Sequence, residues 1–110
     1  MAKKQKTAAD AAVQIKRIRQ MERRFVSASA AVKQLSAALD KYVAAQEAIA
    51  LLKDYYGSEV WRKDFADDEA GKLPEGLKRG VLSEDGIWNL LDDCRELNEQ
   101  MKETVDRIGK

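Results

Sequence analysis

The chain has 110 residues, and its 20 Lys and Arg against 19 Asp and Glu give a formal net charge of +1. It contains no His and one Cys, which removes the most frequent general base and metal ligand and excludes an intramolecular disulfide and a Cys-based zinc site. We therefore expect one small domain that is not an enzyme and that uses no catalytic residue, metal ion or cofactor.

The start of the chain and its apolar runs bear on the compartment. The basic residues 1–7 are not followed by the apolar segment of a secretory signal. The longest strongly apolar run, residues 48–52, is too short to span a bilayer. A lone Cys94 fits a reducing compartment. We expect a soluble cytoplasmic protein that does not contact a membrane.

The first segment of the chain predicts a long helix. Residues 1–56 contain neither Gly nor Pro and are rich in residues that favour helix. We expect a flexible basic tail over residues 1–9 and a helix over about 10–56, capped by Asp10 or Thr7 and ended by Gly57. Its mostly apolar 3-4 spacing, typical of a coiled coil, runs through Ile18, Met21, Phe25, Ala28, Val32, Leu35, Leu39, Tyr42, Gln46, Ile49, Lys53 and Tyr56.

The connector, residues 57–82, differs in character from the first segment. Ser58 can cap a short helix on which Trp61 and Phe65, four residues apart, share one face. Gly71 can end that helix, and Pro74 then begins a turn.

The return helix is predicted over about 83–108, with Ser83 as its N-cap and Gly109 after its end. The resulting fold is all-α, a long, coiled-coil-like antiparallel helical hairpin in a single domain over residues 10–110. The apolar stripe of this helix runs through Ile87, Leu90, Cys94, Leu97, Met101, Thr104 and Ile108, with Leu91 and Val105 beside it.

The two long helices differ in predicted length. A continuous first helix would extend beyond the return helix and leave Ile18, Met21 and Phe25 uncovered, which is typical of an oligomer or of a protein with a partner. The alternative is a break near residues 27–29, after which the N-terminal part folds back as a third long helix. The sequence leaves both open.

The two ends of the chain carry opposite charge. Residues 1–33 have nine Lys and Arg against Asp10 and Glu22, a net of +7, and residues 83–110 have eight acids against four bases, a net of −4. We expect an interaction protein that self-associates or binds another protein. One hypothesis is an antiparallel dimer in which the basic end of one copy packs on the acidic return helix of the other. The candidate contact residues are Arg17, Arg19, Arg23, Arg24 and Phe25.

The same basic segment leaves an alternative function open, that of a nucleic-acid-associated accessory protein. Lys16 and the four Arg residues at 17, 19, 23 and 24 have the charge to follow a phosphate backbone. No aromatic residue lies among them, however, and no nucleic-acid-binding motif is present. A protein or a second copy of the chain is therefore the favoured partner.

The remaining reactive side chains favour structural roles. The acidic cluster Asp64, Asp67, Asp68 and Glu69 lacks the alternating ligands and the Gly of a calcium loop. Cys94 lies on the apolar stripe of the return helix and reads as a small buried hydrophobe.

The aromatic residues predict a small core that joins the two long helices. We expect Asp64 and Arg79 to form a pair that fixes the connector, with Lys78 as another partner for Asp64. A binding site for a peptide or a small molecule is the alternative for this cluster. Its members are Tyr55, Tyr56, Trp61, Phe65, Leu73, Leu77, Val81, Leu82 and Trp88.

Part of the connector resembles a known family. The stretches Tyr55-Tyr-Gly-Ser58, Trp61-Arg-Lys-Asp-Phe65, Asp68-Glu-Ala-Gly-Lys-Leu-Pro74 and Leu77-Lys-Arg-Gly-Val-Leu-Ser-Glu-Asp85, with Trp88 and Leu91, are similar to bacterial domain of unknown function 4298. The resemblance covers about residues 16–104 and implies a small bacterial protein with no assigned activity. The family often has a Pro where Gln46-Glu47 stand here, which implies a straighter first helix in this chain.

Overall fold

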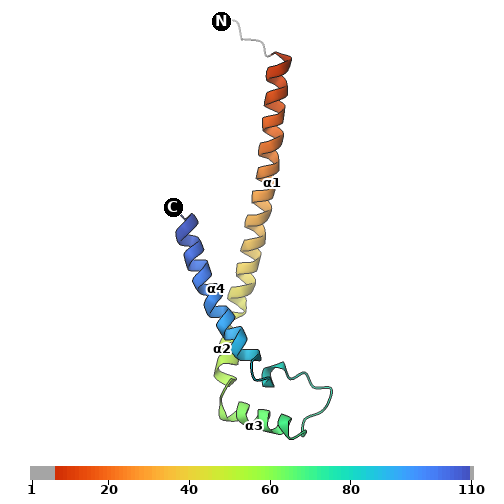
Figure 1. Cartoon of the computed structure of the whole chain (residues 1–110), viewed down its shortest axis with the longest axis vertical. Coiled ribbons are helices and arrows are strands. Elements are labelled where there is room, and N and C mark those ends of the chain that lie inside the picture. The colour runs from red at the N-terminus through yellow and green to blue at the C-terminus, as the bar shows by residue number, and fades with distance from the viewer. Residues whose placement is uncertain (1–6, 110) are drawn as a thin grey trace. The chain divides into compact units, whose positions relative to one another are not determined.

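The computed structural model describes residues 7–109, and within them the fold is all-α, as predicted. These residues form four α-helices and one turn of 3₁₀ helix, and the α-helices are labelled in Figure 1. The elements are α1 (Ala8–Ala44), α2 (Gln46–Tyr55), α3 (Glu59–Glu69), η1 (Gly80–Leu82) and α4 (Gly86–Ile108).

Helix α1 begins with a reciprocal cap. The backbone N–H of Asp10 donates to Thr7 Oγ1 over 3.1 Å, and the N–H of Thr7 donates to Asp10 Oδ2 over 3.4 Å. This is a capping-box arrangement, which satisfies two backbone donors that a helix start leaves unpaired. The helix therefore includes residues 8 and 9 of the predicted tail, and residues 1–6 of that tail lie outside the described residues.

The predicted first helix is interrupted at Ala45 and not near residues 27–29, the place considered from the sequence. Ser27 and Ser29 lie inside α1, so a break there is excluded. The helix stops instead at Ala45, whose φ of −78° and ψ of −11° separate α1 from α2. A ψ near −11° departs from the roughly −42° of an α-helix, although neither Gly nor Pro is present at this position. The expectation of one helix over 10–56 was wrong in this respect.

The chain divides into two compact units after Ala44, and each is described by itself. The N-terminal unit consists of α1, and none of the described residues of α1 is buried. The C-terminal unit contains the remaining elements. In it α4 packs against α2 and against η1, so α2 and α4 form a helical hairpin through the connector.

The turn after α2 is the one predicted from Gly57 and Ser58. Tyr56 has φ −62° and ψ 122°, and Gly57 has φ 78°, a combination that defines a type II turn. The Ser58 N–H donates to Tyr55 O over 3.0 Å and closes the turn. The Ser58 hydroxyl then accepts a hydrogen bond from the Trp61 N–H over 3.1 Å and caps α3.

Helix α3 ends in a Schellman motif at Gly71, also as predicted. Gly71 has φ 69°, a conformation that other residues rarely adopt. Its N–H donates to Asp68 O over 3.0 Å, and the Lys72 N–H donates to Asp67 O over 2.9 Å.

Helix α4 begins at Gly86, three residues later than predicted. Ser83 is not its N-cap residue. Its hydroxyl donates to Gly80 O over 2.8 Å and accepts from the Gly86 N–H over 3.0 Å, so it joins η1 to the first turn of α4. At the other end, Gly109 follows the last helical residue, as expected.

Gly86 is required by this close approach. A Cβ added there would lie 2.5 Å from Gly80 O and 2.6 Å from Ser83 Oγ, whereas a Cβ at Gly76 would meet nothing within 4 Å. We expect Gly86→Ala to lower the free energy of unfolding by about 1–3 kcal/mol, because η1 must move. Urea unfolding of this variant beside Gly76→Ala measures the difference, and equal stabilities in the two variants would contradict the close approach.

Candidate interaction surface

The apolar stripe of α1 is exposed over most of its length, and Tyr42 at its C-terminal end is half-buried. We use "α1 seam" for the residues of the predicted 3-4 spacing that lie within this helix. Phe25 is 67% exposed, Val32 is 68% exposed and Leu35 is 61% exposed. A stripe of this length is unusual for a helix without a partner. The α1 seam consists of Ile18, Met21, Phe25, Ala28, Val32, Leu35, Leu39 and Tyr42.

The candidate contact residues of the sequence analysis divide between two faces of α1. At 100° per residue, Arg17 and Arg24 lie beside the α1 seam, and Phe25 lies on it. Arg19 and Arg23 lie on the far face of the helix, where together with Lys16 they line one shallow hollow. A partner that contacts the α1 seam therefore meets Arg17 and Arg24, whereas the other two Arg side chains point away from it.

In the C-terminal unit, the connector is organised around Trp61. Its ring stacks on Phe65, with 5.2 Å between the ring centroids, and meets Tyr56 edge-on at 5.1 Å. The Trp61 indole N–H donates to Val81 O over 2.9 Å. Trp61 thus ties the end of α2, helix α3 and η1 together.

Tyr55 and Asp64 form a second tie between α2 and α3. The Tyr55 hydroxyl donates to Asp64 Oδ2 over 2.6 Å. This hydrogen bond, followed by burial and by the carboxylate charge, raises the pKa of Tyr55 from its ordinary 10.0 to about 12.

The raised pKa of Tyr55 predicts an alkaline titration. Because its unfolded value is 10.0 and its folded value is about 12, the stabilisation should be complete below pH 10 and lost as the pH rises through 12. In a titration of phenolate absorbance, Tyr55→Phe should remove the step at highest pH, and Asp64→Asn should move that step to lower pH. A Tyr55→Phe variant that retains the latest step would contradict the hydrogen bond.

Arg79 holds the loop between α3 and η1. Its guanidinium forms an ion pair with Asp68 and donates to Pro74 O over 2.7 Å and Glu75 O over 3.4 Å. Its Nε donates to Leu77 O over 3.3 Å. Arg79 therefore supplies donors to the carbonyls of Glu75 and Leu77 and a second donor to Pro74 O, which also accepts from the Leu77 N–H over 3.2 Å.

The predicted pair of Asp64 with Arg79 or Lys78 was wrong. Asp64 and Asp68 are one turn apart on the same side of α3. The earlier carboxylate accepts from Tyr55 at the end of α2. The Asp68 carboxylate lies where the loop between α3 and η1 returns to α3, and it accepts a hydrogen bond from the Arg79 guanidinium.

The core of the C-terminal unit is smaller than predicted and includes a different residue of α4. The only buried apolar residues in the described chain are Leu82, 6% exposed, and Ile87, 2% exposed. Trp88, which was grouped with the core, is 55% exposed. Since neighbouring helical residues point about 100° apart, Ile87 turns inward and Trp88 cannot.

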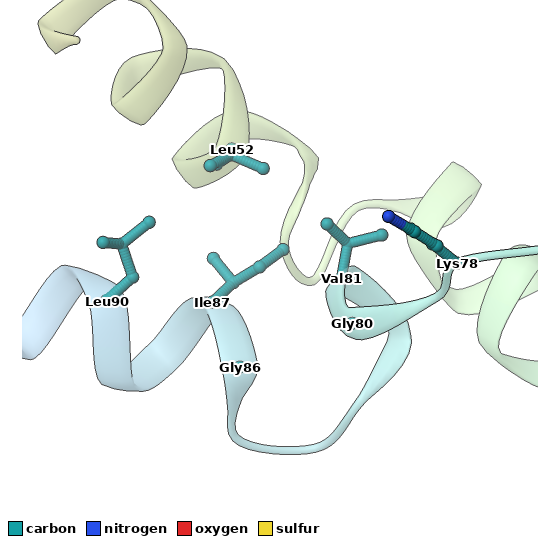
Figure 2. Close-up of a pocket in the computed structure, with 7 residues that line it drawn as sticks. All are labelled: Leu52, Lys78, Gly80, Val81, Gly86, Ile87 and Leu90. Atoms are coloured by element: carbon teal, nitrogen blue, oxygen red, sulfur yellow. The ribbon is translucent and has the colours of Figure 1, made fainter.

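A hollow beside Ile87 lies in the C-terminal unit (Figure 2). Leu52 of α2, Val81 of η1, and Ile87 and Leu90 of α4 point toward the same space, with Lys78 at its edge. It presents one charged group and no arrangement of polar side chains that would fix a small ligand. We interpret the hollow as a place where α2, η1 and α4 pack incompletely against one another.

The reactive side chains of the C-terminal unit are engaged in its structure. Asp67 pairs with Lys63 at 3.1 Å and with Lys72 at 4.0 Å. Cys94 is a half-buried free thiol.

Over residues 7–109, no three His, Cys, Asp or Glu side chains are grouped so that they could hold a metal ion. Searching the same residues finds no helix with the length and apolar character needed to cross a membrane.

Comparison with known proteins gives the family. The profile described as Domain of unknown function (DUF4298) matches residues 18–104. The chain belongs to this family. The DUF4298 match begins at the first residue of the α1 seam and includes the whole connector, so both features lie inside the family region. No curated protein and no solved structure is significantly similar to the chain.

Proposed function

We propose that the protein is a non-enzymatic helical interaction protein that acts through self-association or by binding another protein. The observation that carries this proposal is the α1 seam, an apolar stripe on a helix of 37 residues in which no residue is buried. A helix in a protein gains most of its stability by packing such a stripe against a neighbouring element. The α1 seam is therefore the surface on which a partner helix would pack.

The residues beside the α1 seam support a helical partner. The positions that flank its C-terminal half are small, namely Ser29, Ala31, Ser36 and Ala38. Small flanking residues allow a second helix to approach closely, and the 3-4 spacing supplies side chains that interlock with those of that helix.

A non-enzymatic role agrees with the chemistry on the chain. No His is present, and Asp64, Asp67 and Asp68 of the connector take part in structural pairs. A general base and an oriented nucleophile are therefore hard to assemble. We place the protein in the cytoplasm of a bacterium, in keeping with its lone Cys94 and its family resemblance.

Two neighbouring variants test the α1 seam. Phe25 lies on it, whereas Val26 is equally part of α1, is 57% exposed and lies off it. We expect Phe25→Asp to weaken self-association more than about tenfold, because a charge would be buried between helices. Val26→Asp, the matched control, should leave the association unchanged. Sedimentation equilibrium measures both, and an equal loss in the two variants would contradict the proposal.

Nucleic-acid binding is the second candidate, and the outer face of α1 favours it. Lys16, Arg19 and Arg23 follow one another along that face at intervals of three and four residues. Such a stripe can bind phosphates. In a mobility-shift assay at low salt, Arg19→Glu with Arg23→Glu should abolish retardation of a duplex or single strand. No retardation by the unmodified chain would remove this candidate.

A further inference from the structure

The α1 seam has an internal order that favours one kind of helix pair. In a heptad numbered from Ile18 as position a, two of the four heptads that the α1 seam covers have a β-branched residue at position a with Met or Leu at position d, namely Ile18 with Met21 and Val32 with Leu35. In parallel coiled coils, β-branched residues at position a with Leu at position d favour two helices over three or four. The a positions are Ile18, Phe25, Val32 and Leu39, and the d positions are Met21, Ala28, Leu35 and Tyr42.

Charged residues beside the α1 seam are few, and their positions are informative. Arg17 and Arg24 occupy position g, and Glu22 occupies position e. In a parallel, in-register pair, each g position faces the e position five residues further along the other helix. Arg17 of one copy would therefore face Glu22 of the second copy. By symmetry this ion pair would form twice.

An antiparallel pair of α1 helices loses both ion pairs. In that orientation g positions face g positions, and e positions face e positions. Arg17 and Arg24 would meet each other or the small residues Ala31 and Ala38, and Glu22 would meet another e position. The charges beside the α1 seam therefore discriminate between the two orientations.

Helix α4 is a poorer partner for the α1 seam than its net charge suggests. When the heptad of α4 is numbered with Ile87 as position a, the positions that flank its apolar stripe are e and g. Asp93 is the single acid at these positions, and Arg107 occupies another of them. Its other acids, including Glu96 and Glu103, lie on the opposite face. Ile87, the first residue of the stripe, is buried in the C-terminal unit. The hypothesis that the basic end of α1 packs on the acidic α4 of a second copy therefore has one complementary acid, Asp93, at the contact.

The remaining bases of α1 do not oppose a parallel pair strongly. Lys16, Arg19 and Arg23 lie on the face away from the α1 seam. In a two-stranded pair such side chains point outward on opposite sides of the dimer. Exposed charges further apart than about 8 Å are largely screened at physiological ionic strength.

From the α1 seam and its flanking charges we propose that two copies of the chain pair their α1 helices in parallel and in register, with Arg17 of each copy bound to Glu22 of the other. The proposal rests on the proposed function, which requires only that the α1 seam associates. It adds that the partner is a second copy of the chain, that the two helices run parallel and that they are in register.

Charge-swap variants test the register. Arg17→Glu and Glu22→Arg should each raise the dissociation constant about tenfold, because each places like charges opposite one another. The double variant should return to the original affinity, and an equal mixture of the two single variants should form a heterodimer. Arg23→Glu, the control with the same charge change on the outer face, should not weaken association. Single variants that stay dimeric, or a double variant that is not rescued, would overturn the register.

Crosslinking tests the orientation. In a Cys94→Ser background, Met21→Cys should form an intermolecular disulfide readily, because facing d positions of parallel helices lie within disulfide reach. Arg23→Cys, two residues away on the outer face, is the control and should not crosslink. A chain that sediments as a dimer without the Met21→Cys crosslink would overturn the parallel arrangement and leave the proposed function standing. A chain that stays monomeric would overturn the parallel pair and, with it, the self-association that the proposed function includes.

Discussion

Trp61→Ala is expected to lower the free energy of unfolding by about 3 kcal/mol, which is typical of truncating a packed Trp. Three contacts disappear together: the stack on Phe65, the edge contact with Tyr56 and the hydrogen bond to Val81 O. Because these contacts join three elements of the C-terminal unit, the loss should appear as one cooperative decrease in thermal stability. Circular dichroism at a helical wavelength measures it.

Two further variants separate the sources of this effect. Trp88→Ala removes the other Trp, which is 55% exposed, and should cost much less. Trp61→Phe keeps an aromatic ring but loses the donor to Val81, so the cost should be about 1–2 kcal/mol. If Trp61→Ala left the melting temperature unchanged, Trp61 would not be a packing residue, and a binding role for the aromatic cluster would become the better interpretation.

Arg79→Met is expected to cost about 2 kcal/mol of stability. The substitution keeps much of the side-chain volume but removes the ion pair to Asp68 and the hydrogen bonds to the carbonyls of Pro74 and Leu77. The Asp68 carboxylate is half-buried and would be left without its cation. The connector between α3 and η1 should loosen, and urea unfolding together with faster amide exchange in η1 measures this.

The neighbouring basic residue provides the control for Arg79. Lys78→Met removes the same charge at an exposed position and should change stability by less than about 0.5 kcal/mol. Arg79→Lys should fall between the two, because an ammonium can keep the pair with Asp68 but cannot reach several carbonyls at once. Equal effects of Lys78→Met and Arg79→Met would contradict the role assigned to the guanidinium.

The sequence predicted best those features that depend on a few adjacent residues. Gly57 and Gly71 end helices with positive φ, and Ser58 caps α3, as their residue types indicated. In each case the backbone conformation follows from the residue and its nearest neighbours. The all-α class followed in the same way from helical periodicity and the absence of a strand pattern.

The features that the sequence missed depend on residues far apart in the chain. Asp64 and Asp68 are equivalent on α3 until the loop brings Arg79 to one of them. The burial of Ile87 depends on where Leu82 of η1 and helix α2 meet α4. The interruption at Ala45 carries no Gly or Pro, and the family pattern with Pro at the next residues was the one available signal.

The candidate surface was only partly predictable. The 3-4 spacing defines the α1 seam, and its residues lie on one helix in the structure, because the spacing is a property of one helix. Grouping Arg19 and Arg23 with Arg17 and Arg24 by net charge was the weaker step. The heptad position of each residue separates the outer face from the residues that flank the α1 seam, and that information was present in the sequence.

The most direct test of the central claim, that the α1 seam pairs with another helix, is the molar mass of the unmodified chain in solution. We expect sedimentation equilibrium at low salt and micromolar concentration to show a mass that rises with concentration from 12.4 kDa toward twice that value. Phe25→Asp should hold the mass at the monomer value. A constant 12.4 kDa for the unmodified chain across the concentration range would contradict self-association through α1.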